Sequence, residues 1–180
     1  MNRHDDFNRL DTLIHEMGHF INAEYFNERQ SIDDAEISIF AAEIASTVNE
    51  ILLNQYMQSI SNKKQKKYYL NQFLSSVRST IFRQTLFSEF ELFAHTTIEN
   101  EQPLTYKELN EKYFELNKKY YGSSCKLPEE LKYEWSRIPH FYRPYYVYSY
   151  STGMLTGITI ASRLLKESDF AKKYIEFLSN

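Results

Sequence analysis

Hydrophobic residues recur along this chain at helical spacing, and no segment alternates cleanly between apolar and polar positions. A spacing of three and four residues places apolar side chains on one face of a helix, whereas a half-buried strand alternates every second residue. The first clear example comprises Leu10, Leu13, Ile14, Met17 and Ile21. Only four glycines and four prolines occur, and we expect them where helices end. The pattern therefore predicts an all-α fold.

The pattern divides the chain into successive helical stretches. They cover residues 8–26, 32–59, 64–99 with one break, 105–122, 145–166 and 169–178. Ser31 is a suitable N-cap for the second stretch, and Thr105 with Glu108 forms a capping box for the fourth. Residues 123–144 hold three of the four prolines and are predicted to form a long functional loop. With no repeat or linker visible, we expect residues 1–180 to form a single helical region.

Composition narrows the functional classes. The net charge of −3 argues against nucleic-acid binding, which requires a basic surface. The single cysteine, Cys125, excludes an internal disulfide framework and fits a reducing compartment. The N-terminus lacks an apolar signal segment, and the most apolar late run, residues 154–165, is too short to span a bilayer. We therefore expect a cytoplasmic protein that binds neither nucleic acid nor membrane.

The strongest chemical signal is the HExxH motif at residues 15–19. His15 and His19 are four residues apart, so a helix places both imidazoles on one face, where both can bind one zinc ion. Glu16 follows the first histidine and lies beside the metal, where its carboxylate can take a proton from an activated water molecule. The motif therefore predicts a hydrolytic zinc site with Glu16 as general base.

A catalytic zinc site needs a third protein ligand, and helix geometry favours Glu43. About eight residues follow His19 in the first predicted helix, and about eleven lead back to Glu43 in the second, so an antiparallel pair places Glu43 level with the histidines. Glu36 and Glu50 lie two turns to either side. Apolar neighbours surround Glu43 in the sequence, and a buried carboxylate needs a partner. The prediction is one Zn²⁺ per chain.

With these motifs, the sequence resembles oligoendopeptidase F, a member of the thimet-oligopeptidase-like zinc metallopeptidases. The resemblance extends in order over nearly the whole chain. Its motifs are residues 15–19, 38–50, 82–85, 90–91, 137–142 and 145–153. The family commonly has a further histidine soon after the zinc motif, where this chain has Phe20, Ile21 and Asn22.

The resemblance implies a helical zincin-type fold in which zinc is held by His15, His19 and Glu43. It implies Glu16 as the general base of a zinc metalloendopeptidase that hydrolyses short oligopeptides. It also implies contacts to the substrate carbonyl from further along the chain. These come from His140 and from one or more of Tyr145, Tyr148 and Tyr150. Such donors stabilise the negative charge that develops on the carbonyl oxygen.

Family members carry a long helical N-terminal portion before the zinc motif, whereas this chain begins almost at the motif. The expectation is therefore a C-terminal catalytic portion: a fragment, a truncated relative or half of a split protein. The alternative function is a zinc-binding chain that is inactive alone and depends on a separate N-terminal half or self-associates. A di-iron bundle is disfavoured, because that architecture uses two ExxH motifs and this sequence has one.

Overall fold

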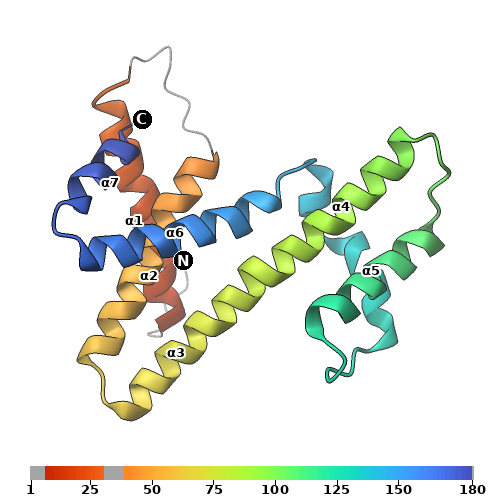
Figure 1. Cartoon of the computed structure of the whole chain (residues 1–180), viewed down its shortest axis with the longest axis horizontal. Coiled ribbons are helices and arrows are strands. Elements are labelled where there is room, and N and C mark those ends of the chain that lie inside the picture. Colours follow the sequence, from red (N-terminus) through yellow and green to blue (C-terminus); the bar gives the residue numbers. More distant parts are fainter. Residues whose placement is uncertain (1–6, 31–38, 180) are drawn as a thin grey trace. The chain divides into compact units, whose positions relative to one another are not determined.

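The structure is a computed structural model that describes residues 7–30 and 39–179. Every regular element in these ranges is helical, which confirms the predicted all-α fold (Figure 1). The α-helices are α1 (Phe7–Asn27), α2 (Ile39–Ile60), α3 (Lys63–Val77), α4 (Arg83–Glu99), α5 (Tyr106–Tyr121), α6 (Tyr148–Lys166) and α7 (Phe170–Leu178). A π-helical segment, η2 (Arg78–Phe82), joins α3 to α4, and two 3₁₀ segments, η3 (Glu129–Arg137) and η4 (Pro139–Tyr142), precede α6.

The chain divides into two compact units. The first combines Met1–Val77 with Thr152–Asn180, and the second is Arg78–Ser151. The first unit carries the HExxH motif, and the second carries the segment around His140. The single region expected over residues 1–180 stays a prediction.

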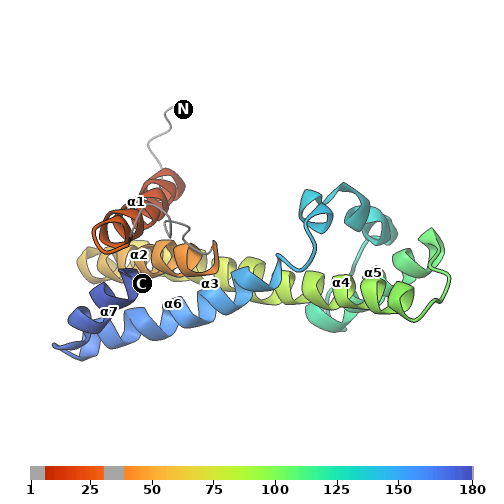
Figure 2. The same cartoon turned by 90° about the horizontal axis from the view of Figure 1, so that it is seen from above.

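In the first unit, α1 lies alongside α2 (Figure 2), and the two helices run in roughly opposite directions (Figure 1). The Asn49 side-chain amide donates to the carbonyl of Ile14 at 3.5 Å, and Gly18 lies directly against Ser46. Contacts thus move toward the start of α1 as α2 proceeds, which fixes the antiparallel direction. This arrangement confirms the predicted pairing of the two helices.

The core of the first unit lies on the other face of α2. Ile44, Val48 and Ile51 pack against Ala161 of α6, and partly buried residues of α3 and α7 surround this cluster. Asn22 is 2% exposed and donates from its side chain to the carbonyl of Leu178 at 2.9 Å. Residues 20–22, which depart from the family pattern, thus place a buried amide that joins α1 to the end of α7.

The second unit has its own aromatic core. Phe87 and Phe90 of α4 pack with Tyr113 and Leu116 of α5, together with Ile138 and Val147. The Tyr113 hydroxyl donates to Glu134 at 2.8 Å, and Glu134 also accepts from Arg83 at 2.8 Å. Thr105 and Glu108 form the predicted capping box, and Gly122 is the C-cap residue of α5.

Several predicted boundaries need correction. The last long helix begins at Tyr148 instead of Tyr145, because Tyr145 has a φ of 54° and cannot continue a right-handed helix. The predicted loop 123–144 contains the 3₁₀ segments η3 and η4. Gly18, Gly153 and Gly157 lie within helices and not at helix ends. The predicted start of the second helix and its cap, Ser31, lie outside the described residues. Among the residues that the structure describes, no helix is long and apolar enough to cross a bilayer.

Candidate metal centre

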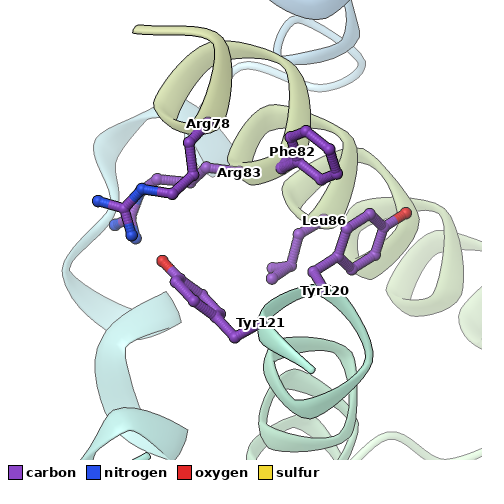
Figure 3. A pocket seen from close by; sticks show the side chains of 6 residues that line it. All are labelled: Arg78, Phe82, Arg83, Leu86, Tyr120 and Tyr121. Carbon is purple, nitrogen blue, oxygen red and sulfur yellow. The ribbon is translucent and has the colours of Figure 1, made fainter. Parts of the chain in front are cut away.

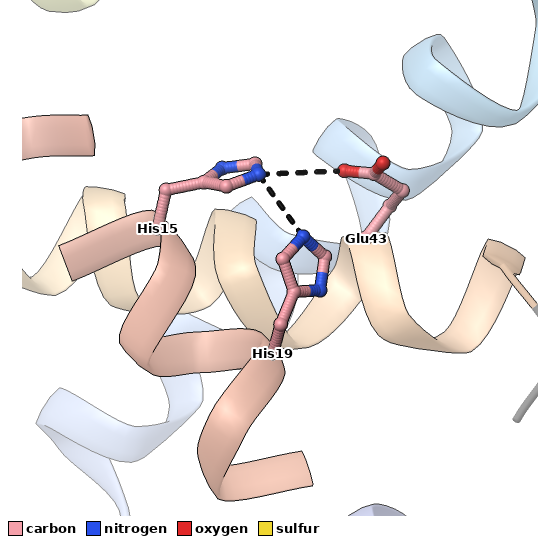
Figure 4. A group of neighbouring side chains, drawn as sticks. All are labelled: His15, His19 and Glu43. Atoms are coloured by element: carbon pink, nitrogen blue, oxygen red, sulfur yellow. Dashed lines mark hydrogen bonds and ion pairs between the residues drawn. The ribbon is translucent and has the colours of Figure 1, made fainter. Parts of the chain in front are cut away.

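The three predicted zinc ligands converge on one point beside the α1–α2 pair (Figure 4). The Nε2 atoms of His15 and His19 are 3.1 Å apart, and Glu43 Oε2 is 3.9 Å from His15 Nε2. One ligand atom from each residue lies within 4.8 Å of the other two. Two imidazoles and a carboxylate form a donor set suited to a divalent transition metal.

The close approach of the two helices depends on Gly18, which sits inside the HExxH motif. A Cβ atom at this position would lie 2.5 Å from Ser46 Cα and 2.9 Å from the Ala45 carbonyl oxygen, both backbone atoms of α2. Only a residue without a side chain permits this separation. Next to the contact, the Ser46 hydroxyl donates to the Glu43 backbone carbonyl at 3.0 Å. Gly18 therefore lets α2 come near enough to present Glu43 to the histidines.

A second carboxylate supports the site from behind. Glu50 Oε1 lies 2.5 Å from His15 Nδ1, the ring nitrogen that faces away from His19 and Glu43. Metal-binding histidines commonly donate their other N–H to a carboxylate, which fixes the tautomer and the ring orientation. The sequence did not predict this contact, because Glu50 lies two helical turns beyond Glu43, which the spacing placed level with the histidines. The signal was present: Glu50 follows Glu43 by seven residues and so shares its helix face.

Acidic neighbours alter the ionisation of the site. The hydrogen bond to Glu50 raises the pKa of His15 above its ordinary value, although burial acts in the opposite sense. Asp11, one turn before His15 on α1, has its pKa raised to about 6, first by burial and then by the negative charge of Glu50. The site is thus electronegative, as expected for residues that bind a cation.

Glu16 occupies the predicted place on α1, next to His15, and its residue is exposed. Its negative charge contributes to the raised pKa of His15, after the larger effects of Glu50 and Glu43. The Glu16 carboxylate is therefore accessible to solvent on the residue next to His15. Its role as general base stays a prediction.

The second unit brings some of the other predicted residues together. The His140 ring lies edge-on to the Tyr150 ring at 5.8 Å and stacks on Tyr146 at 6.3 Å. The Tyr150 hydroxyl donates to the Tyr146 hydroxyl at 3.2 Å. Tyr146 was not among the predicted residues. The signal was its spacing, because it precedes Tyr150 by four residues, and residues four apart are neighbours on one face of a helix. His140, Tyr146 and Tyr150 therefore form one polar aromatic cluster.

Tyr145 has a different environment. Its ring lies tilted against the His95 ring, with the ring centres 4.8 Å apart, and its backbone N–H donates to Glu91 Oε1 at 2.8 Å. Glu91 is only 4% exposed, so a buried carboxylate holds the backbone at the residue with positive φ. Tyr148 begins α6 and is 51% exposed. The three predicted tyrosines thus have different environments. Tyr150 lies in the cluster with His140, the backbone of Tyr145 is held by the buried Glu91, and Tyr148 is exposed.

Comparisons with known proteins show the family of this chain. The sequence model of peptidase family M3 matches residues 2–180. The oligopeptidase PepF of Bacillus subtilis is 45% identical over 180 residues, which cover 99% of this chain and 27% of that protein. The group B oligopeptidase PepB of Streptococcus agalactiae is 40% identical over 180 residues, covering 99% of this chain and 30% of its own length.

A solved structure shares the fold. The crystal structure of oligoendopeptidase-F from Enterococcus faecium superposes with a TM-score of 0.82 at 42% identity, and covers 96% of this chain and 31% of that one. The chain therefore spans less than a third of the length of these relatives.

Proposed function

The chain belongs to peptidase family M3, and on that premise we propose that it supplies the zinc site and general base of a metalloendopeptidase acting on short oligopeptides. The observation that carries the proposal is the convergence of His15, His19 and Glu43 within 4.8 Å. The names of the relatives, oligopeptidase and oligoendopeptidase, support the substrate class. A cytoplasmic location stays a prediction.

The donor set fits zinc. Tetrahedral zinc with bonds of ~2.0–2.1 Å holds its ligand atoms ~3.3 Å apart. The separation of 3.1 Å between the two Nε2 atoms and that of 3.9 Å between His15 Nε2 and Glu43 Oε2 bracket this value. Three protein ligands leave a fourth position open, as in catalytic sites. Zinc bound here would act as a Lewis acid and lower the pKa of a water molecule to about 7.

The chain's own groups have distinct tasks in peptide hydrolysis. The Glu16 carboxylate takes the proton from the attacking water and passes it to the departing amine nitrogen. The Glu50 carboxylate keeps His15 oriented through Nδ1, so that Nε2 faces the other ligands. The Ser46 hydroxyl donates chiefly to the Glu43 backbone carbonyl at 3.0 Å, and Glu43 Oε2 lies 3.5 Å from the same hydroxyl as a weaker, shared acceptor.

The carbonyl oxygen of the substrate acquires negative charge as the water attacks, and fixed donors there accelerate the reaction. We assign this role to His140 and Tyr150, which lie in one cluster, with Tyr145 and Tyr148 as further candidates. In the free chain the single Tyr150 hydroxyl proton is donated to Tyr146, so it must turn from Tyr146 to the substrate oxygen when substrate binds. The loss of one such donor costs about 10²–10³ in kcat.

Zinc content and peptide cleavage together test the proposal. The dialysed chain should retain about one zinc per molecule, and His15→Ala should lose it. A zinc-loaded chain should cleave an internally quenched peptide of about eight residues, and a chelator should stop cleavage. Zinc content below about a tenth of an equivalent in the unmodified chain would exclude the metal assignment.

The outer face of α1 favours a second candidate function. Leu10, Leu13, Met17 and Phe20 follow one another at helical spacing and are 38%, 57%, 44% and 63% exposed. Such an apolar stripe is typical of a surface that another polypeptide covers. The candidate is a zinc-binding chain that cleaves peptides only when a further polypeptide packs on α1. Full zinc content without cleavage, together with self-association in light scattering, would support it over the first.

A further inference from the structure

The second unit contains a pocket that the peptidase site does not use. It has a cavity volume of about 180 Å³ and lies where the π-helical segment η2 meets the end of α5. Its lining residues are Arg78, Phe82, Arg83, Leu86, Tyr120 and Tyr121. All six belong to the same compact unit, so its geometry is independent of the first unit.

One end of the pocket is cationic. Arg78 is exposed, and its guanidinium lies 5.9 Å from the centre of the Tyr121 ring. Among the described residues, no carboxylate lies within ion-pair distance of Arg78. Arg83, by contrast, pairs with Glu134 at 2.8 Å. Figure 3 shows the Tyr121 hydroxyl directed toward the two guanidinium groups. The pocket thus offers an uncompensated positive charge beside a hydroxyl.

The other end is apolar. Phe82 and Leu86 project from successive turns, and the ring of Tyr120 faces them (Figure 3). The Tyr120 hydroxyl points away from the pocket and donates to Glu89 at 3.0 Å, so only the ring contributes to the lining. Phe82 is 50% exposed, whereas Leu86 is 1% exposed and forms the floor. A ligand at this end needs an apolar group.

The backbone gives a reason for this arrangement. The π-helical segment runs from Arg78 to Phe82. Its backbone hydrogen bonds span five residues instead of four, so the turn is wider and holds about one extra residue. Insertions of this kind are uncommon and occur frequently at functional sites. Here the segment presents Arg78 and Phe82 to the same pocket as Arg83, which begins the following helix.

We propose that this pocket binds a small organic carboxylate, with the carboxylate at Arg78 and the apolar group against Phe82. An apolar cavity of about 150 Å³ accepts a benzene-sized molecule, so the volume here admits a ring or a branched chain that carries a carboxylate. The same chemistry occurs in a free aromatic or aliphatic acid and in the C-terminal residue of a peptide with an apolar side chain. A guanidinium and a carboxylate form charge-assisted hydrogen bonds, which favour the acid over its amide.

Calorimetric titration of the full chain tests the proposal, with a chelator present so that no peptide is hydrolysed. The probes are benzoate and acetyl-Ala-Leu, each compared with its neutral amide, and sulfate as an anion without an apolar group. At least one carboxylate should bind about tenfold or more tightly than its amide. The tighter of the two carboxylates identifies the source of the ligand, a free acid or a peptide end.

Two variants and a control complete the test. Arg78→Gln removes the free charge from an exposed side chain and should weaken the carboxylate at least about tenfold. Phe82→Ala removes the apolar wall and should weaken it as well. Lys118→Gln is the matched control, since Lys118 is an exposed cation over the Phe114 ring outside the pocket. Equal binding of acid and amide, unchanged binding in Arg78→Gln, or sulfate binding as tight as the carboxylates would each overturn the proposal.

Discussion

The Nδ1 atom of His15 lies 2.5 Å from Glu50 Oε1, while Nε2 of the same ring faces His19 and Glu43. One imidazole thus joins a carboxylate on each side, both supplied by α2. Glu50 accepts the proton of Nδ1 in its hydrogen bond, which leaves the lone pair of Nε2 available to a metal.

Removal of Glu50 should weaken metal binding although Glu50 is not a ligand. Glu50→Ala is expected to lower zinc affinity by about 10–100-fold, because His15 loses the group that orients it. Glu50→Gln retains an acceptor without the charge, and its affinity should lie between those of Glu50→Ala and the unmodified chain. Competition with a chromophoric chelator measures the effect, with Glu28→Ala, an exposed glutamate beyond α1, as control. Equal affinity in all four proteins would show that Glu50 does not support the site.

Glu16 should be required for cleavage and dispensable for zinc. Glu16→Gln preserves the shape of the side chain and removes the base, so the cleavage rate should fall at least about a hundredfold. The zinc content should stay at its original level. Glu24→Gln, an exposed glutamate on the same helix, provides the control. A variant that keeps both zinc and activity would place the general base elsewhere.

Gly18 should tolerate no side chain. In Gly18→Ala the new Cβ would meet the backbone of Ser46 at 2.5 Å, so α1 and α2 must separate. Overpacking of this kind costs about 1–3 kcal/mol, and the separation should also reduce zinc affinity by moving Glu43 away from the histidines. Gly153→Ala is a matched control in α6, where the nearest atom to the new Cβ is Glu43 Cβ at 3.9 Å. Urea unfolding and zinc titration of the two variants decide the matter.

The sequence was informative where the relevant geometry is local. His15 and His19 share a helix face because of their spacing, and helix rise places Glu43 level with them once the two helices pair antiparallel. The buried face of α1 was harder to predict. Leu13 and Met17 belong to the apolar pattern but are exposed, whereas Gly18 and Asn22 are buried.

The residues that sequence reasoning missed depend on tertiary contacts. The contact between Glu50 and His15 depends on how closely α1 and α2 approach each other. That separation is set by Gly18 of α1. The positive φ of Tyr145 depends on a carboxylate 54 residues earlier, Glu91. Neither relationship is encoded in the periodicity of one segment.

Glu91 should hold the segment that precedes α6. Glu91→Ala leaves the Tyr145 N–H without its acceptor at the residue with positive φ, and should destabilise the second unit by about 1–3 kcal/mol. Glu91→Gln keeps an oxygen at the same place and should cost less. Amide hydrogen exchange at Tyr145 reports the contact directly and should accelerate in Glu91→Ala. Unchanged exchange in that variant would contradict the assigned role of Glu91.

Asp11 should make the metal-free chain less stable as the pH rises. Burial and the charge of Glu50 raise its pKa from 3.8 to about 6, so the folded chain binds more protons than the unfolded chain between these values. The contribution of Asp11 to stability is therefore complete below about pH 4 and is lost as the pH rises through 6. Asp11→Asn cannot ionise, and at pH 7 it should be more stable than the unmodified chain by about 1 kcal/mol, a value reduced for solvent screening.

Urea midpoints at pH 4, 5, 6 and 7, measured with a chelator present, distinguish this effect from a general change in charge. The difference between Asp11→Asn and the unmodified chain should grow across that interval, because only the unmodified chain must ionise a half-buried carboxyl near Glu50. Asp169→Asn removes an exposed aspartate just before α7 in the same unit and should leave the pH dependence unchanged. Parallel curves for all three proteins would show that Asp11 ionises without cost. Zinc should diminish the difference, since a cation held by His15, His19 and Glu43 offsets the negative charge that Asp11 adds.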